Sequence, residues 1–333
     1  MKRTLLPIIA LAACFNTAVA IDKNTVEIKF NGNTATVNMA SNISSYVTNQ
    51  SSGSHVKLVQ SDNFAGVDKT VDNEDGEILY VLSGSTTNGE FYLEGSFKCT
   101  VVLNGVTITN PAGPAINIQN GKRVSVSVKS GTTNTIADGA NDTYNGAFHC
   151  KGHTKFKGKG TLNVKGNSRH AIYSKEYIEI KNLTLNITNA LKDGIHCKEY
   201  FLMESGTVKI SGAADDGVQV ELGGTTSTGT TSGHEEEDSG NFYMTGGTLN
   251  ISGYSGKAVK ADGVIKCTGG TRNSPNSDME EQATVSNVQR STFNVERIYD
   301  LQGRIVQRST FNVQRSTIIV KHVGDRTFKK TVK

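Results

Sequence analysis

The sequence predicts an all-β protein built as a parallel β-helix, in which each coil of the chain spans about 23 residues. The 333 residues include 35 Gly, no Trp and 36% hydrophobic residues, a composition typical of many short strands and turns. A short segment that begins with Ala or Gly recurs along the middle of the chain, and a segment that begins with Thr recurs beside it. Repetition at a fixed period of this length is typical of solenoid folds.

The first repeat places one apolar residue at the same point of each coil. Its copies start 32, 24, 23, 23 and 41 residues apart, so the last interval contains an insertion. Equivalent residues of adjacent coils lie about 4.8 Å apart in a parallel sheet, and the apolar residues should therefore form one interior ladder. The ladder residues are Ile116, Phe148, Ile172, Ile195, Val218 and Val259.

The second repeat predicts another wall of the helix, because each copy alternates polar and apolar residues as a half-buried strand does. Its copies are Thr161–Val164, Thr184–Ile187, Thr207–Ile210 and Thr248–Ile251.

The cysteines are predicted to be small buried hydrophobic residues. Cys150 and Cys197 occupy the same inward position two coils apart, roughly 10 Å, whereas a disulfide needs Cα atoms within about 7 Å. Cys99 and Cys267 are interpreted in the same way.

The N-terminus predicts export. Residues 1–20 have the basic start, the apolar run Leu5–Ala13 and the Ala18-Val19-Ala20 cleavage site of a secretory signal peptide. An alternative is lipid attachment at Cys14, which follows small residues. We expect no transmembrane segment, because no later stretch reaches the ~20 apolar residues that a span needs. The predicted location is therefore secreted or on the cell surface, at the outer membrane.

The rest of the chain divides by its regularity and charge. Residues 21–96 are predicted to form the N-terminal cap and first coil, 97–271 the β-helix and 272–284 a linker. The insertion Leu222–Asn241 is predicted to be a loop. Residues 285–333 form a block with ten Lys and Arg against three acidic residues. A nucleic-acid partner is not expected, because that block has no aromatic stacking platform beside its arginines.

The basic block contains the eight-residue sequence VQRSTFNV at Val288–Val295 and again at Val306–Val313. Around these repeats, Ile298–Arg304 and Thr317–Lys321 resemble the C-terminal sorting signal of type IX secretion substrates. The resemblance implies secretion machinery of the outer membrane as a partner. The alternative is an unstructured basic tail.

A calcium site is the metal site that the sequence predicts. Asp193 and Asp216 fall at the same position of adjacent coils, Asp215 is adjacent, and an acidic loop follows. Calcium takes six to eight oxygen ligands in loose geometry. The candidate ligands are Asp193, Asp215, Asp216, Glu236, Glu237 and Asp238.

Two other interpretations of these carboxylates stay open. One is a salt-bridged ladder, because His170 and Lys257 flank Asp193 and Asp216 at the same coil position. The other is a glycosidase pair, since retaining enzymes hold two carboxyl groups about 5–5.5 Å apart. A zinc site is not expected, because the histidines have no evident tetrahedral set of partners.

The candidate carbohydrate-binding residues are lysines and tyrosines that repeat with the coils. Lysines recur at intervals of 24 and 23 residues, and a row of ammonium groups beside tyrosines suits a polymer with regularly spaced carboxylates. The alternatives are a solvated edge with local Lys–Glu pairs and a lyase in which a lysine acts as the base. The candidates are Lys151, Lys175, Lys198, Tyr173, Tyr177 and Tyr200.

A family pattern is carried by the segments Ala115–Gly131, Lys157–Val164, Lys198–Gly206, Asp215–Gly217 and Gly256–Gly263. Through these segments the chain, over residues 25–271, resembles the bacterial carbohydrate-binding β-helix family, formerly a domain of unknown function. The resemblance implies a right-handed parallel β-helix that binds calcium and associates with acidic plant polysaccharides or cellulose, and that is similar in shape to calcium-dependent pectate lyases.

We therefore predict an exported carbohydrate-binding protein that is not an enzyme and uses calcium as a cofactor, with polygalacturonate-like polymers or cellulose as partners. The alternatives are a calcium-dependent polysaccharide lyase of the pectate type and a surface adhesin or scaffold.

Overall fold

The computed structural model describes residues 21–64, 76–141, 143–223, 240–274, 279–281, 298–299, 305–306, 317–323 and 326–332. The chain divides into two units, Met1–Thr284 and Val285–Lys333. Within the described ranges all regular elements are strands, apart from short turns. No helix in those ranges is long and apolar enough to cross a membrane. The predicted signal peptide, with Cys14, lies outside them.

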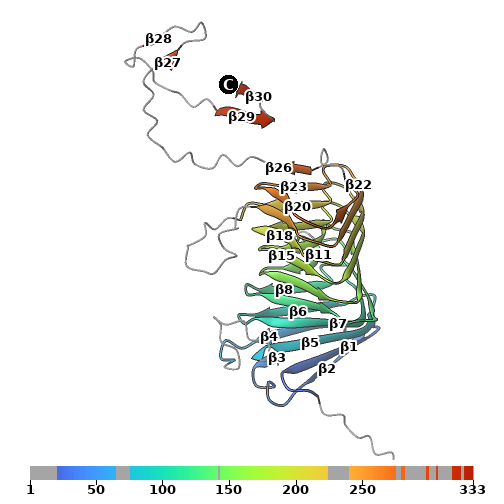
Figure 1. Ribbon diagram of the computed structural model, residues 1–333. Coiled ribbons are helices and arrows are strands. Elements are labelled where there is room, and N and C mark those ends of the chain that lie inside the picture. Colours follow the sequence, from blue (N-terminus) through green and yellow to red (C-terminus); the bar gives the residue numbers. More distant parts are fainter. Residues whose placement is uncertain are drawn as a thin grey trace, which may run out of the picture. The chain divides into compact units, whose positions relative to one another are not determined.

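The first unit is a stack of coils in which strands that follow one another around a coil belong to different walls (Figure 1). One wall is a ten-stranded sheet whose neighbours run parallel except at β3 and β4. Its strands are, in spatial order, β26 (Met279–Glu281), β23 (Val259–Ala261), β20 (Val218–Glu221), β17 (Ile195–Lys198), β14 (His170–Ser174), β11 (Gly146–Cys150), β8 (Ile116–Asn120), β6 (Glu90–Gly95), β4 (His55–Gln60) and β3 (Val47–Asn49).

The other walls are two arms of one 16-stranded sheet that meet at β7 (Cys99–Thr109). The first arm continues from β7 through β9 (Val124–Val128), β12 (Thr154–Gly158), β15 (Ile178–Lys181), β18 (Tyr200–Met203), β21 (Asn241–Met244) and β24 (Ile265–Cys267). The second arm continues from it through β10 (Thr133–Ala137), β13 (Thr161–Gly166), β16 (Thr184–Ala190), β19 (Thr207–Ala213), β22 (Thr248–Tyr254) and β25 (Thr271–Arg272).

The N-terminal residues continue these walls. β1 (Thr25–Asn31) pairs antiparallel with β2 (Thr34–Met39) and parallel with β5 (Ile78–Thr86), which itself pairs with β7. At the other end, β26 pairs parallel with β23. The segments that the sequence predicted as a cap with one coil and as a linker thus supply strands to the β-helix.

The interior ladder follows the predicted register. Phe148 pairs with Ile116 and Ile172, and Ile172 with Ile195. Val218 pairs with Ile195 on one side and with Val259 on the other. All six ladder residues are at most 1% exposed. Because no single coil could bury such a face alone, the stacking of coils provides the hydrophobic stabilisation. The predicted all-β parallel β-helix is confirmed.

All four cysteines of the described first unit are free. Cys99, Cys150 and Cys197 are buried as expected, whereas Cys267 is partly exposed because β24 is the last strand of the first arm. The prediction of full burial is therefore wrong for Cys267.

In the second unit, β27 (Ile298–Tyr299) pairs antiparallel with β28 (Ile305–Val306), and β29 (Thr317–Val323) pairs antiparallel with β30 (Arg326–Val332).

Candidate functional site

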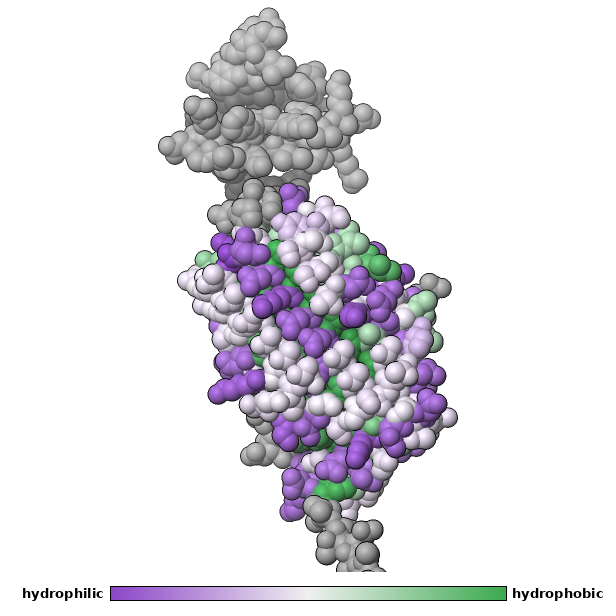
Figure 2. All heavy atoms as spheres, turned by 90° about the vertical axis from the view of Figure 1, so that its right-hand side faces the viewer, coloured by the Kyte–Doolittle hydropathy of each residue, from purple (hydrophilic) through white to green (hydrophobic). Residues whose placement is uncertain are grey.

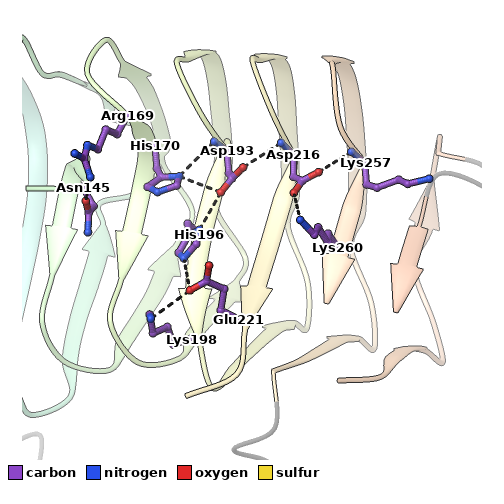
Figure 3. Close-up of polar contacts among 10 residues, drawn as sticks. All are labelled: Asn145, Arg169, His170, Asp193, His196, Lys198, Asp216, Glu221, Lys257 and Lys260. Atoms are coloured by element: carbon purple, nitrogen blue, oxygen red, sulfur yellow. Dashed lines mark hydrogen bonds and ion pairs between the residues drawn. The ribbon is translucent and has the colours of Figure 1, made fainter. Parts of the chain in front are cut away.

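The most densely connected polar cluster of the described coils surrounds Asp193, which is 1% exposed (Figure 3). Its Oδ2 lies 3.1 Å from Nδ1 of His170 and 2.9 Å from Nδ1 of His196. Its Oδ1 accepts a hydrogen bond of 3.0 Å from the backbone N–H of Asp216. Both carboxylate oxygens are thus occupied by partners from this chain.

The local sequence explains why aspartate occupies this position. Asp193 and Asp216 each precede a glycine that begins the inward turn of the coil, and Asp216 Oδ1 accepts a hydrogen bond of 2.7 Å from the backbone N–H of Lys257. Each aspartate therefore joins its own coil to the next. A Cβ at Gly194 would lie 2.8 Å from the carbonyl oxygen of Gly217, so a side chain there would break the close stacking.

A chain of charges leads from Asp193 to the surface. His196 Nε2 lies 3.5 Å from Glu221 Oε2, which lies 3.2 Å from Lys198 Nζ. The hydrogen bond from His196 is the main cause that lowers the pKa of Glu221 to about 2. Burial lowers the pKa of His196, but the two carboxylates outweigh this effect and the pKa is raised. Its two carboxylate neighbours therefore favour the protonated form of His196.

His170 lies on the other side of Asp193 and behaves differently. Burial lowers its pKa, and the attraction of the Asp193 carboxylate for the protonated imidazole does not compensate. Burial acts to raise the pKa of Asp193, but its contacts with His170 and His196 hold that pKa below its ordinary value. The Asp193 carboxylate thus lies between one imidazole whose pKa is lowered and one whose pKa is raised.

Asp216 differs from Asp193 because one of its carboxylate oxygens accepts no hydrogen bond from the described residues. It is 1% exposed, and its Oδ2 makes no hydrogen bond within the described part of the chain, although Lys260 Nζ lies 3.6 Å away. Burial raises its pKa. Asp215 beside it is exposed. A Cβ at Gly256 would lie 2.9 Å from Asp215 Oδ1 and closer still to Asp216 Oδ1, so the glycine keeps open a space into which both carboxylates project.

The predicted calcium ligands are therefore only partly gathered by the described residues. Asp193, Asp215 and Asp216 each offer an oxygen within 4.8 Å of the others. Glu236, Glu237 and Asp238 lie outside the described residues. The salt-bridged ladder alternative is met only in part. His170 lies 3.1 Å from Asp193, whereas Lys257 contacts Asp216 through its backbone N–H alone and its Nζ lies 3.7 Å from Glu280 Oε2.

The three predicted lysines lie at one corner of the helix. Lys151 and Lys175 directly follow β11 and β14, and Lys198 is the last residue of β17. Lys151 and Lys175 are exposed. Lys198 is paired with Glu221. The corner therefore presents two solvent-facing ammonium groups and one that is already neutralised.

The three predicted tyrosines form stacks and expose little of their rings. Tyr173 stacks between His149 and His196, with ring centroids 5.1 and 5.4 Å away. Tyr177 stacks on Tyr200 at 4.7 Å. Tyr173, Tyr177 and Tyr200 are 8%, 9% and 1% exposed. A sugar ring therefore meets at most the edges of Tyr173 and Tyr177, and Tyr200 is covered.

A groove of about 250 Å³ lies on the first arm, beyond the lysine corner. Its cationic side chains come from β12, β15 and the turn before β9. Lys155 Nζ lies 3.1 Å from Glu179 Oε2, Lys181 Nζ lies 2.8 Å from Glu204 Oε2, and Arg123 is paired with the buried Glu77. The cationic residues of the groove are Arg123, Lys155, Lys157 and Lys181. The groove thus carries more positive than negative charge.

The outer side of the second arm carries neutral polar side chains with few charges among them. Thr184 pairs with Thr161 and Thr207 in a column of threonines, and Asn186 pairs with Asn163 on one side and with Lys209 on the other. Asn186 Nδ2 donates a hydrogen bond of 3.0 Å to Asn163 Oδ1. Figure 2 shows the side of the helix on the right of Figure 1, where β22 lies, and side chains of hydrophilic and intermediate hydropathy cover most of it.

A second cluster was not predicted from the sequence. His153, Glu176 and Glu199 offer ligand atoms within 4.8 Å of one another at the lysine corner. These residues are spaced by 23 and 23, so the period of the coils contained the signal. The sequence shows no tetrahedral set of ligands around the histidines, and His153 falls in line with the two glutamates only when the coil period is applied to residues of different types.

These features define a class of protein: a parallel β-helix whose outer surface carries clustered carboxylates, imidazoles and lysines. A family model described as "Carbohydrate-binding domain-containing protein" matches residues 65–317, and the chain belongs to this family. The predicted resemblance to a carbohydrate-binding β-helix family is thereby confirmed at the level of the family.

Individual relatives are distant. A carbohydrate-binding domain-containing protein of Acetivibrio thermocellus is 24% identical over 112 residues, which cover 31% of this chain and 39% of that protein. The aligned part thus spans well under half of the relative's length. Among solved structures, a polysaccharide lyase-like protein from C. thermocellum, described as a gadolinium derivative, is similar with a TM-score of 0.54 and 20% identity. That likeness covers 75% of this chain and 93% of the neighbour, and it shows the shared fold.

Proposed function

We propose that the protein binds acidic polysaccharide without cleaving it. The observation that carries this proposal is the excess of cations on this side of the helix. Lys151 and Lys175 are exposed at the corner, and the groove on the first arm is lined by four cationic and two acidic side chains. Coils repeat about every 4.8 Å, so the cations form rows that a polymer with repeated carboxylates can follow. The family to which the chain belongs supports carbohydrate as the ligand class.

The proposal favours binding over lyase or glycosidase chemistry. Asp193 has both oxygens occupied and is buried, so it is badly placed to act as a nucleophile or acid. Lys198, one candidate base of a lyase, is held by Glu221. Lys175 is exposed, in contrast to the desolvated lysines that serve as general bases.

Calcium is proposed to assist at Asp215 and Asp216. The spare oxygen of Asp216 and the space left by Gly256 fit a cation that takes oxygen ligands, whereas Asp193 already has its partners. When bound, calcium would supply positive charge that attracts uronate carboxylates. Asp215 and Asp216 would hold the ion, and Lys260 would lose its contact with Asp216.

The outer side of the second arm supports a second ligand, a neutral glucan such as cellulose. The threonine and asparagine columns of the second arm offer hydroxyl and amide groups at the regular spacing of the coils. Such groups hydrogen-bond sugar hydroxyls and carry no charge. This face and the cationic groove lie on different arms, so variants can separate the two ligands.

The test measures retention of the full chain on polygalacturonate and on cellulose, with calcium or with chelator, while ultraviolet absorbance follows unsaturated product. We expect retention on polygalacturonate that weakens with salt and chelator, and no product. Lys157→Glu should reduce it at least about tenfold, whereas Lys209→Glu on the second arm serves as the matched control. Formation of unsaturated product would show that the protein is a lyase and overturn the proposal. Equal retention of both variants would exclude the groove as the binding site for polygalacturonate.

Export is proposed on the predicted signal peptide and the C-terminal resemblance to a type IX sorting signal. Expression with residues 1–20 present, followed by N-terminal sequencing of the secreted chain, tests the first part. A mature chain that begins at Ile21 is expected, and a lipid-modified Cys14 would support the anchored alternative. Deletion of residues 285–333 should abolish surface attachment, and unchanged attachment would exclude the sorting role.

A further inference from the structure

The second cluster lies where each coil turns from the ten-stranded sheet into the first arm. His153 ends the turn between β11 and β12, Glu176 lies in the turn between β14 and β15, and Glu199 is the single residue between β17 and β18. One residue from each of three successive coils therefore contributes to the same point of the surface.

The three side chains converge although the coils of His153 and Glu199 are not adjacent to each other. His153 and Glu199 are separated by two coil spacings, roughly 9.6 Å, yet His153 Nε2 lies 3.3 Å from Glu199 Oε2. Glu176, from the coil between them, brings its carboxylate within 4.8 Å of both. The outer two residues thus reach over the middle coil from opposite sides.

Neighbouring groups fix the positions of two of the three side chains. The imidazole of His153 stacks on Tyr177 with centroids 4.4 Å apart, and this contact leaves its Nε2 directed at Glu199. Glu199 has a φ of 60°, in the left-handed region that non-glycine residues seldom adopt. Such a backbone is strained, and here the strain occurs at the residue that supplies a carboxylate.

The two carboxyl groups need a positive charge or a proton between them. Glu176 and Glu199 each place a carboxylate oxygen within 4.8 Å of the other. Two adjacent ionised carboxylates repel each other, and a bound cation relieves this repulsion as well as a shared proton does.

We propose that His153, Glu176 and Glu199 bind a divalent transition-metal ion of the zinc type, through one imidazole nitrogen and two carboxylate oxygens. The imidazole distinguishes this site from the calcium site, because calcium takes oxygen ligands whereas zinc takes nitrogen and oxygen. The side chains of His153 and Glu199 are 32% and 13% exposed. Three protein ligands at a solvent-reachable corner leave a coordination position open for water or for a hydroxyl or carboxylate of a ligand.

The experiment uses the full chain after treatment with chelator. Zn²⁺ is titrated by calorimetry, and Co²⁺ is added separately because its visible absorption reports nitrogen and oxygen coordination. We expect one zinc ion that is lost in His153→Gln and in Glu176→Gln, with affinity at least about a hundredfold lower. His55→Gln is the matched control, since His55 of β4 lies 3.9 Å from Glu90 of β6 in another His–Glu pair, whose side chains are 44% and 21% exposed.

Circular dichroism of each variant establishes that the β-helix is intact. Zinc binding of equal affinity in the folded His153→Gln and Glu176→Gln variants would overturn the proposal and place the ion elsewhere in the chain. Absence of zinc binding by the unaltered chain would overturn it as well. Asp215→Asn removes a proposed calcium ligand and should leave the zinc isotherm unchanged, so failure of either metal site is distinguishable from failure of the other.

Discussion

Asp193 Oδ2 lies 2.9 Å from Nδ1 of His196, which comes three residues later in the same coil, and both side chains are almost fully buried. The pair lies at the junction of two coils, because Asp193 also contacts His170 of the coil before and the backbone of the coil after. A buried carboxylate with these partners links three coils by charge as well as by the backbone ladder.

We predict that Asp193→Asn destabilises the protein by about 3 kcal/mol, because removal of one partner leaves the other charge buried without compensation. Denaturant unfolding monitored by circular dichroism measures the change. Asp215→Asn, at an exposed neighbouring carboxylate, is the control and should shift stability by less than about 0.5 kcal/mol. A loss below about 1 kcal/mol in Asp193→Asn would show that the ionic contacts contribute little.

The same cluster predicts a pH dependence of stability. The pKa of His196 is raised above its ordinary value of 6.5 by its carboxylate neighbours, against the effect of burial. A raised pKa gives stability that is complete below the unfolded value and is lost as the pH rises through the folded value. Stability should therefore fall above pH 6.5 in the unaltered chain and fall less in His196→Gln. Unfolding curves at a series of pH values test this, and parallel profiles of the two proteins would contradict it.

At acid pH the stability is expected to fall as the pH decreases, because Asp193 becomes protonated. The pKa of Asp193 is lowered by His170 and His196 despite burial, so its contribution is present above the ordinary value of 3.8 and is lost as the pH falls through the folded value. The cluster is thus most stabilising between the two transitions.

Gly256→Ala is predicted to disturb the proposed calcium site. The new Cβ would lie 2.9 Å from Asp215 Oδ1 and closer to Asp216 Oδ1, so the carboxylates must move apart. We expect at least tenfold weaker calcium binding and a loss of about 1–3 kcal/mol in stability. Calorimetry with Ca²⁺ measures the first and denaturant unfolding the second. Gly121→Ala is the control, because a Cβ there meets nothing within 4 Å. If Gly256→Ala bound calcium as tightly as the control, the calcium ion would not bind beside Gly256.

The cysteines are predicted to differ in reactivity. Burial raises the pKa of the Cys150 thiol to about 11, and it raises those of Cys99 and Cys197 as well. All three should resist a thiol reagent in the native protein and react after unfolding, since the thiolate is the reactive form. Cys267, which is partly exposed, should be modified first among the four. Mass spectrometry of peptides after brief labelling measures this order, and early labelling of Cys150 would contradict the packing.

The sequence predicted the fold well because its signal repeats. The positions of Ile172 and Ile195 follow from spacing alone, since a period of about 23 residues converts alignment directly into contact. The tyrosines were predicted to face sugars, but spacing cannot show that Tyr177 and Tyr200 of adjacent coils cover each other. Nor could it show that His170 and His196 occupy Asp193, because that contact depends on side-chain direction.

The interior ladder gives a final prediction about stability. Ile172 is fully buried between Phe148 and Ile195 of the adjacent coils. Because these neighbours are closely packed, they cannot move to fill the void that a smaller side chain would leave. Ile172→Ala should therefore cost about 3 kcal/mol in denaturant unfolding, through lost burial and the cavity that remains. Leu191→Ala removes a similar side chain that is 54% exposed and should cost less than about 0.5 kcal/mol. Equal effects of the two substitutions would mean that the ladder does not provide the stability assigned to it, and that the polar contacts between coils dominate instead.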